Sequence, residues 1–141
     1  MRRKRSLSII LFFLFFSMIS RSQTTATIDS LENESQACLD KGEFMLGCSI
    51  HFYNQMDSML NIVYNKLRSG LDSSQKELLK KEQKEWLKKR DKYFRQTEDK
   101  LKKAIKENGG IAAQDDEMFR YEDNARFVKE RILELINKLK N

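Results

Sequence analysis

The strongest constraint on the fold is a regular apolar pattern near the end of the chain. From residue 118 to residue 139, apolar side chains recur at alternating spacings of three and four residues. The pattern consists of Met118, Tyr121, Ala125, Val128, Ile132, Leu135 and Leu139. Because this spacing puts all of them on one side of an α-helix, it predicts a helix that begins after Gln114 and buries this stripe. The stripe would be covered either by other helices of the same chain or by a second copy.

Three more helices are predicted upstream, over residues 28–39, 49–69 and 72–106. The chain contains no proline, and no stretch shows the alternation of β-branched and polar residues that marks a strand. The helix over 72–106 would be about 50 Å long, so it would be kinked or project as an arm. The predicted fold class is therefore all-α: a small antiparallel helical bundle of three to four helices with one long central helix, forming a single domain over residues 23–141.

The expected helix ends carry ordinary capping signals. Gly70 suits the position just past the second helix, where a left-handed residue often stands. Ser74 and Glu77 have the spacing of a capping box at the start of the third helix.

The first 22 residues predict an export signal. Four basic residues precede an apolar run of 13 residues at positions 7–19, and Ser20-Arg21-Ser22 offers small residues at the positions that a signal peptidase reads. The run is shorter than the roughly 20 residues that span a bilayer, so we expect cleavage before Gln23, with an uncleaved anchor as the alternative. The mature protein would be periplasmic or extracellular and would not span the membrane.

Removing residues 1–22 removes most of the basic excess. The chain has 27 Lys+Arg and 21 Asp+Glu; five of the basic residues lie in that segment, which leaves 22 against 21, a net charge of +1. This balance does not favour nucleic acid as a partner. In the helix over 72–106, Trp86 and most lysines fall on different faces, whereas a nucleic-acid-binding surface would combine them. We therefore expect a solvated lysine face, or a weak, salt-sensitive contact with an anionic envelope polymer.

Cys38 and Cys48 are the only two cysteines. In an exported chain an even cysteine count predicts a disulfide, and closing so short a loop contributes about 2–3 kcal/mol to stability. The alternative is a metal site built on Cys48 and His51, but the chain has one histidine and no second cysteine pair. No metal and no cofactor are expected.

Two polar residues, Gln83 and Arg90, fall on the packing stripe of the long helix. The other members of the stripe are Leu79, Trp86, Tyr93, Thr97, Leu101 and Ala104. A buried guanidinium needs a partner, and Asp57, Asn61 and Tyr64 follow one side of the second helix. We expect Arg90 to bond Asp57, with Gln83 or Tyr64 completing the network. The alternative is that Arg90 extends past the stripe into solvent.

These polar residues belong to two motifs that resemble the lysozyme inhibitor LprI-like N-terminal domain family. The matching positions are Asp57, Leu60, Asn61 and Tyr64 in a D-x-x-L-N-x-x-Y element, and Gln83, Trp86, Arg90 and Asp91 in a Q-x-x-W-x-x-x-R-D element. With the two cysteines, Gly109-Gly110 and the segment RILEL at residues 131–135, the resemblance covers roughly residues 35–139. It implies an exported helical domain that binds and blocks lysozyme, with the polar set, Trp86 and Asp91 included, in an architectural role. Phe94 stands where family members often have a further cysteine.

A candidate partner surface lies at residues 114–123, which hold five carboxylates and one arginine. With Phe119 and Tyr121 they would form an acidic, aromatic contact for lysozyme or another cationic cell-wall hydrolase, because charge complementarity speeds association. The alternative is helix capping, in which Asp115, Asp116 and Glu117 complement the helix dipole.

No catalytic site is predicted. There is no Ser-His-Asp arrangement, no metal-ligand cluster and no phosphate loop, and catalysis needs convergent groups in a pocket. Two classes remain: an inhibitor of lysozyme, or a structural or adaptor module that binds an envelope polymer or a partner protein.

Overall fold

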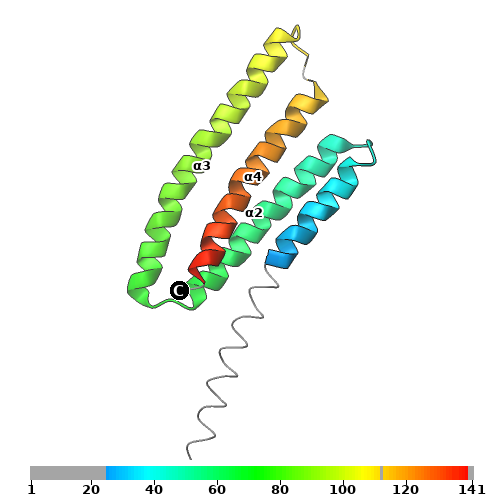
Figure 1. Ribbon diagram of the computed structural model, residues 1–141. Coiled ribbons are helices and arrows are strands. Elements are labelled where there is room, and N and C mark those ends of the chain that lie inside the picture. Colours follow the sequence, from blue (N-terminus) through cyan, green and yellow to red (C-terminus); the bar gives the residue numbers. More distant parts are fainter. Residues whose placement is uncertain (1–24, 112, 140–141) are drawn as a thin grey trace, which may run out of the picture. The chain divides into compact units, whose positions relative to one another are not determined.

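In a computed structural model of the 141-residue chain, the structure describes residues 25–111 and 113–139. Within these residues it contains four helices and no strand, which confirms the all-α prediction. The helices cover residues 25–39, Met45–Ser69 (α2), Ser73–Glu107 (α3) and Gln114–Lys138 (α4) (Figure 1). The predicted signal segment, residues 1–22, lies outside the described residues. None of the helices in the described ranges combines the length and apolar character that a membrane crossing requires.

The chain divides into two compact units, residues 1–34 and 35–141, which are described separately. The described part of the first unit, residues 25–34, is entirely helical. The second unit contains both cysteines, both motifs and helices α2, α3 and α4, and all that follows concerns this unit.

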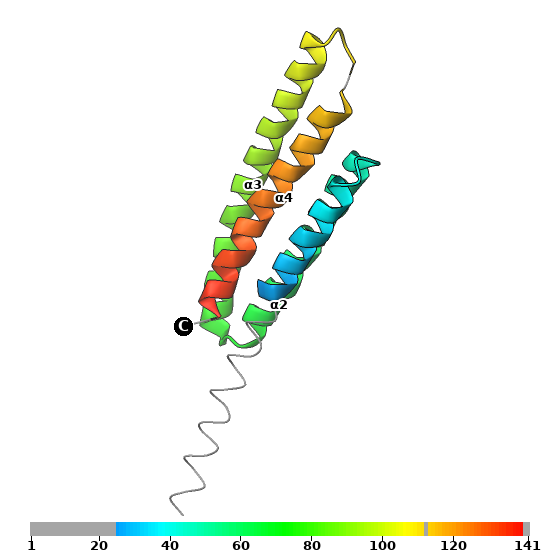
Figure 2. The same cartoon turned by 45° about the vertical axis from the view of Figure 1, so that its right-hand side comes forward.

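Helix α4 packs against both α2 and α3. It runs parallel to α2 and antiparallel to α3 (Figures 1 and 2). The stripe predicted on α4 covers the α2 side: Met118, Ala125, Val128, Ile132 and Leu135 are buried, and Tyr121 and Leu139 are partly buried. Opposite them, α2 buries Met56, Met59, Leu60, Val63 and Leu67. The stripe is therefore covered within one chain.

Helix α3 is one continuous helix of 35 residues. Its capping box is formed by Asp72 and Gln75, and not by Ser74 and Glu77 as predicted. The Asp72 carboxylate accepts the backbone N–H of Gln75 at 2.8 Å, and Gln75 Oε1 accepts the backbone N–H of Asp72 at 3.2 Å. The predicted pair and the observed pair have the same spacing of three residues. The observed box begins at Asp72, two residues before Ser74.

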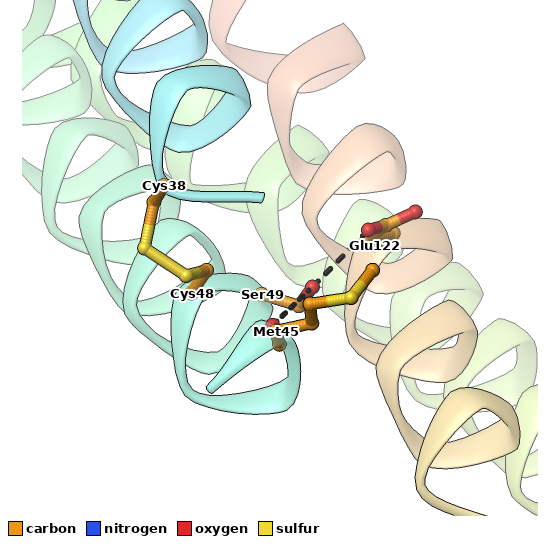
Figure 3. Close-up of a disulfide and its surroundings, with 5 residues drawn as sticks. All are labelled: Cys38, Met45, Cys48, Ser49 and Glu122. Carbon is orange, nitrogen blue, oxygen red and sulfur yellow. Dashed lines mark hydrogen bonds between the residues drawn. A yellow bond between two sulfur atoms is a disulfide. The ribbon is translucent and has the colours of Figure 1, made fainter. Parts of the chain in front are cut away.

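The start of α2 also differs from the prediction. The helix begins at Met45 instead of residue 49, so Cys48 lies in its first turn. At its other end Gly70 is the C-cap, with a right-handed φ of −86°. The predicted disulfide between Cys38 and Cys48 is present (Figure 3). Because both sulfur atoms are used in it, Cys48 is not available as a metal ligand, and the metal-site alternative is wrong.

Candidate functional site

Trp86 lies on the packing face of α3, and the lysines lie elsewhere. The indole is buried against α4, where its ring stacks on Phe127 at a centroid distance of 5.9 Å. The cationic side chains predicted to point away are exposed: Lys80, Lys81, Lys84, Lys88, Lys92 and Arg95. The predicted separation of Trp86 from the exposed cationic face is therefore confirmed.

Arg90 does not bond Asp57 as predicted. Its Nε and Nη2 donate to Oδ1 of the adjacent Asp91, at 3.0 and 2.7 Å. The guanidinium also lies over the rings of Trp86 and Phe94, at 5.8 and 5.7 Å from their centroids. Because the Arg90 side chain remains 26% exposed, its charge keeps contact with water and needs no partner on α2.

Gln83 bonds a residue that was not predicted to be its partner. Its Oε1 accepts hydrogen bonds from Nε and Nη2 of Arg131 on α4, at 3.1 and 3.0 Å. Arg131 is only 3% exposed, and its Nη1 also donates to Glu82 and Glu134, at 2.8 Å each. Lys138 bonds the second oxygen of Glu82. This cluster joins the start of α3 to the end of α4.

The carboxyl of Glu82 responds to this environment. Partial burial alone would raise its pKa, but the hydrogen bonds from Lys138 and Arg131 and the charges of both cations outweigh that effect. The net result is a pKa below the ordinary value of a glutamate.

A second polar contact between α3 and α4 is buried. The Thr97 hydroxyl lies 2.9 Å from Oδ1 of Asn124, and both side chains are less than 5% exposed. Between this contact and Arg131, Phe127 stacks on Tyr93 at 4.5 Å. Asn124, Phe127 and Arg131 therefore form a second packing face of α4, spaced three and four residues apart. The spacing of three and four residues is the sequence signal that could have revealed this face. It was not recognised because two of the three residues are polar.

Five of the predicted polar residues line one groove between α2 and α3. Its volume is about 360 Å³. Its walls are Asp57, Leu60, Asn61 and Tyr64 from α2, and Lys80, Gln83, Lys84, Leu87 and Arg90 from α3. The hydrogen bonds that Asn61, Gln83 and Arg90 make do not cross it: Asn61 donates to the Asp57 carbonyl in its own helix, Gln83 bonds α4, and Arg90 bonds Asp91. The structure thus brings these residues together as a groove lining instead of a bonded network.

Phe94, at the position of the family's further cysteine, contacts α2 through its ring. It packs edge-on against Tyr53, with centroids 5.9 Å apart, and Tyr53 also lies 5.9 Å from Tyr121. Burial, followed by the charge of Asp57, raises the pKa of the Tyr53 hydroxyl. An aromatic cluster of Tyr53, Phe94 and Tyr121 therefore links α2, α3 and α4.

The structure divides the predicted acidic and aromatic surface. Asp115, Asp116 and Glu117 lie in the first turn of α4, where their charges complement the helix dipole, and no side chain caps this helix by a hydrogen bond. Tyr121 turns toward α2, whereas Phe119 stays 55% exposed. Tyr121 therefore contributes to packing, and the remaining four residues stay near the surface.

The large apolar residue with the greatest exposure in the described ranges was not predicted as a site. Phe44, just before α2, is 84% exposed. Its backbone is left-handed, with φ 52° and ψ 33°, and among the described residues it is the one non-glycine residue with positive φ. Such a conformation costs about 1–3 kcal/mol and is retained where the surrounding structure imposes it.

The start of α2 is held on two sides (Figure 3). Cys48 is bonded to Cys38 through the disulfide, and Phe44 accepts the backbone N–H of Cys48 at 3.1 Å. The next residue, Ser49, is fully buried, and its hydroxyl donates to Glu122 on α4 at 3.1 Å. Adjacent residues thus connect the loop before α2 to the rest of the bundle.

These features describe a small all-helical domain that is closed by one disulfide. In the described residues no cluster of three or more His, Cys, Asp or Glu side chains could hold a metal ion. The chain belongs to the LprI family, because the family model described as "Lysozyme inhibitor LprI" matches residues 23–135. No curated protein and no solved structure matched the chain.

Proposed function

We propose that this protein is exported and that it binds and inhibits a lysozyme in the bacterial cell envelope. The observation that carries the proposal is the family match, which covers both motifs and both cysteines. The match begins at Gln23, directly after the predicted cleavage site. A disulfide between the only two cysteines also suits an oxidising compartment. The proposed activity is binding, and no step of catalysis is assigned to the chain.

Inhibition by binding is favoured by a stable, preformed surface that can contact the enzyme. The bundle supplies it through the buried apolar contact between α2 and α4 and through the Arg131 cluster between α3 and α4. A preorganised surface binds more tightly because less conformational entropy is lost on association. Inhibition by simple occlusion of the enzyme's cleft would then need no cofactor.

The test starts from the full chain, expressed in bacteria. The oxidised product is purified, and mass spectrometry of its N-terminus shows whether residues 1–22 have been removed. It is then titrated into lysozymes of several types in a cell-wall clearing assay. We expect inhibition of at least one type that saturates near one inhibitor per enzyme. A folded, oxidised protein that inhibits none of them in large excess would contradict the proposal; retention on isolated cell-wall material would then favour the adaptor alternative.

A further inference from the structure

We propose, on the basis of the function proposed above, that the loop tip formed by residues 40–44 is the part of the chain that enters the lysozyme cleft, with Phe44 as its central contact. The partner chemistry that fits is an apolar recess bordered by cations.

Exposure and backbone conformation single out Phe44. Its side chain is more exposed than that of any other large apolar residue in the described part of the chain. Most exposed apolar residues stand singly on helices at no conformational cost, as Leu78 does. Phe44 instead combines an exposed ring with a left-handed backbone, a conformation that glycine or asparagine would adopt more easily. The chain thus keeps an aromatic residue where folding alone would favour a different one.

The tip is rigid at its base. The disulfide between Cys38 and Cys48 closes the loop, and Ser49 anchors the start of α2 to Glu122 (Figure 3). At the other side of the tip, Gln36 donates to the Asp40 carboxylate at 2.8 Å. An aromatic residue that projects from an anchored base suits a binding hot spot, because it can fill a pocket while the backbone beneath it loses little entropy.

The charges near Phe44 indicate the kind of partner. The tip carries two acidic residues, Asp40 and Glu43, and one basic residue, Lys41. The first turn of α4, with three carboxylates, lies at the same end of the second unit as the tip (Figures 1 and 2). An enzyme that binds an anionic wall polymer presents cations around its cleft, and such clefts are concave and largely apolar. An aromatic tip beside carboxylates is complementary to such a cleft.

The test compares wild-type protein with Phe44→Gly in the clearing assay and in thermal unfolding. Glycine removes the ring and relieves the left-handed backbone, so the variant should fold and melt at the same temperature as the wild type or higher. If Phe44 is the central contact, its inhibition constant should rise by about tenfold or more. The matched control is Leu78→Ala, which truncates another exposed apolar residue and should inhibit as the wild type does.

Each outcome has one meaning. Loss of inhibition in Phe44→Gly, with its melting temperature kept and the control unchanged, supports the inference. Equal inhibition by wild type and Phe44→Gly overturns it and leaves the proposed function standing. The same holds if Phe44→Gly inhibits normally but shifts a self-association or a vesicle-binding equilibrium, because the ring then faces a second copy or a lipid surface. Wild-type protein that inhibits no lysozyme overturns the proposed function, and the inference with it.

Discussion

Arg131 of α4 donates two hydrogen bonds to the side-chain oxygen of Gln83 on α3, at 3.1 and 3.0 Å. Gln83 belongs to a motif that resembles the family pattern, whereas Arg131 lies 48 residues further along the chain. The contact fixes the register of α3 against α4, since both guanidinium edges are used and the arginine is buried. This contact is the basis on which we propose an architectural role for the motif glutamine.

The first prediction concerns Arg131. Arg131→Ala should lower the free energy of unfolding by about 2–4 kcal/mol, because it removes a buried, fully bonded cation together with its aliphatic stem. Arg131→Met should cost less than Arg131→Ala, since the stem is kept and the carboxylates of Glu82 and Glu134 can reach water. Urea unfolding measures both. The control is Arg126→Ala, whose exposed ion pair with Asp123 should contribute less than about 1 kcal/mol. Equal losses at positions 126 and 131 would contradict the assigned role.

The second prediction concerns pH. The folded-state pKa of Glu82 lies below its unfolded value, so the ionised carboxylate contributes stability above the unfolded pKa. That contribution should be lost as the pH falls through the folded pKa. Glu82→Gln should therefore have a lower melting temperature than the wild type at neutral pH. The difference between the two melting temperatures should shrink under acidic conditions. A difference that stays constant from neutral to acidic pH would show that the charge of Glu82 is not involved.

The third prediction concerns the disulfide. Replacing Cys38 and Cys48 together by serine should destabilise the protein by about 2–3 kcal/mol, because the short loop is no longer closed in the unfolded state. The helices should persist, since the buried apolar contact between α2 and α4 is unaffected. Circular dichroism and urea unfolding test both statements. If the loop tip is the inhibitory contact, this variant should also inhibit less at temperatures where it is fully folded; undiminished inhibition would argue against a preformed tip.

The fourth prediction concerns the first turn of α4. Neutralising Asp115, Asp116 and Glu117 together should slow association with a cationic lysozyme, and the effect should shrink as salt is added. Loss of the favourable helix-dipole interaction should cost at most about 1 kcal/mol per residue in stability. Stopped-flow binding at two salt concentrations is the measurement. An unchanged association rate with a small loss of stability would leave these residues only their capping role.

The regular parts of the fold could be predicted because they depend on local patterns. The stripe on α4 required only the helical period, and the disulfide required a count of two cysteines together with the expectation of export. The register of a cap was harder, since Asp72 with Gln75 and Ser74 with Glu77 have the same spacing. Two pairs with equal spacing compete, and the local sequence alone does not decide between them.

The candidate site was less predictable because it depends on long side chains and on strain. The long side chain of Arg90 can bond either its neighbour Asp91 or a residue on α2. Which of these it bonds depends on the distance between the helices, and the observed partner is Asp91. The buried contact of Arg131 with Gln83 was missed because a charged residue on a packing face interrupts the apolar pattern. Phe44 was missed because its backbone is left-handed, and phenylalanine is not a residue that signals such a turn.

The most direct test of the central claim is the rate at which a lysozyme cleaves a soluble oligosaccharide substrate, measured while the oxidised protein is titrated in. A protein that binds the enzyme should lower this rate with saturation near one inhibitor per enzyme, the same stoichiometry that is expected in the clearing assay. Inhibition of wall clearing without any effect on the soluble substrate would contradict the account, because the protein would then be shielding the wall and not blocking the enzyme.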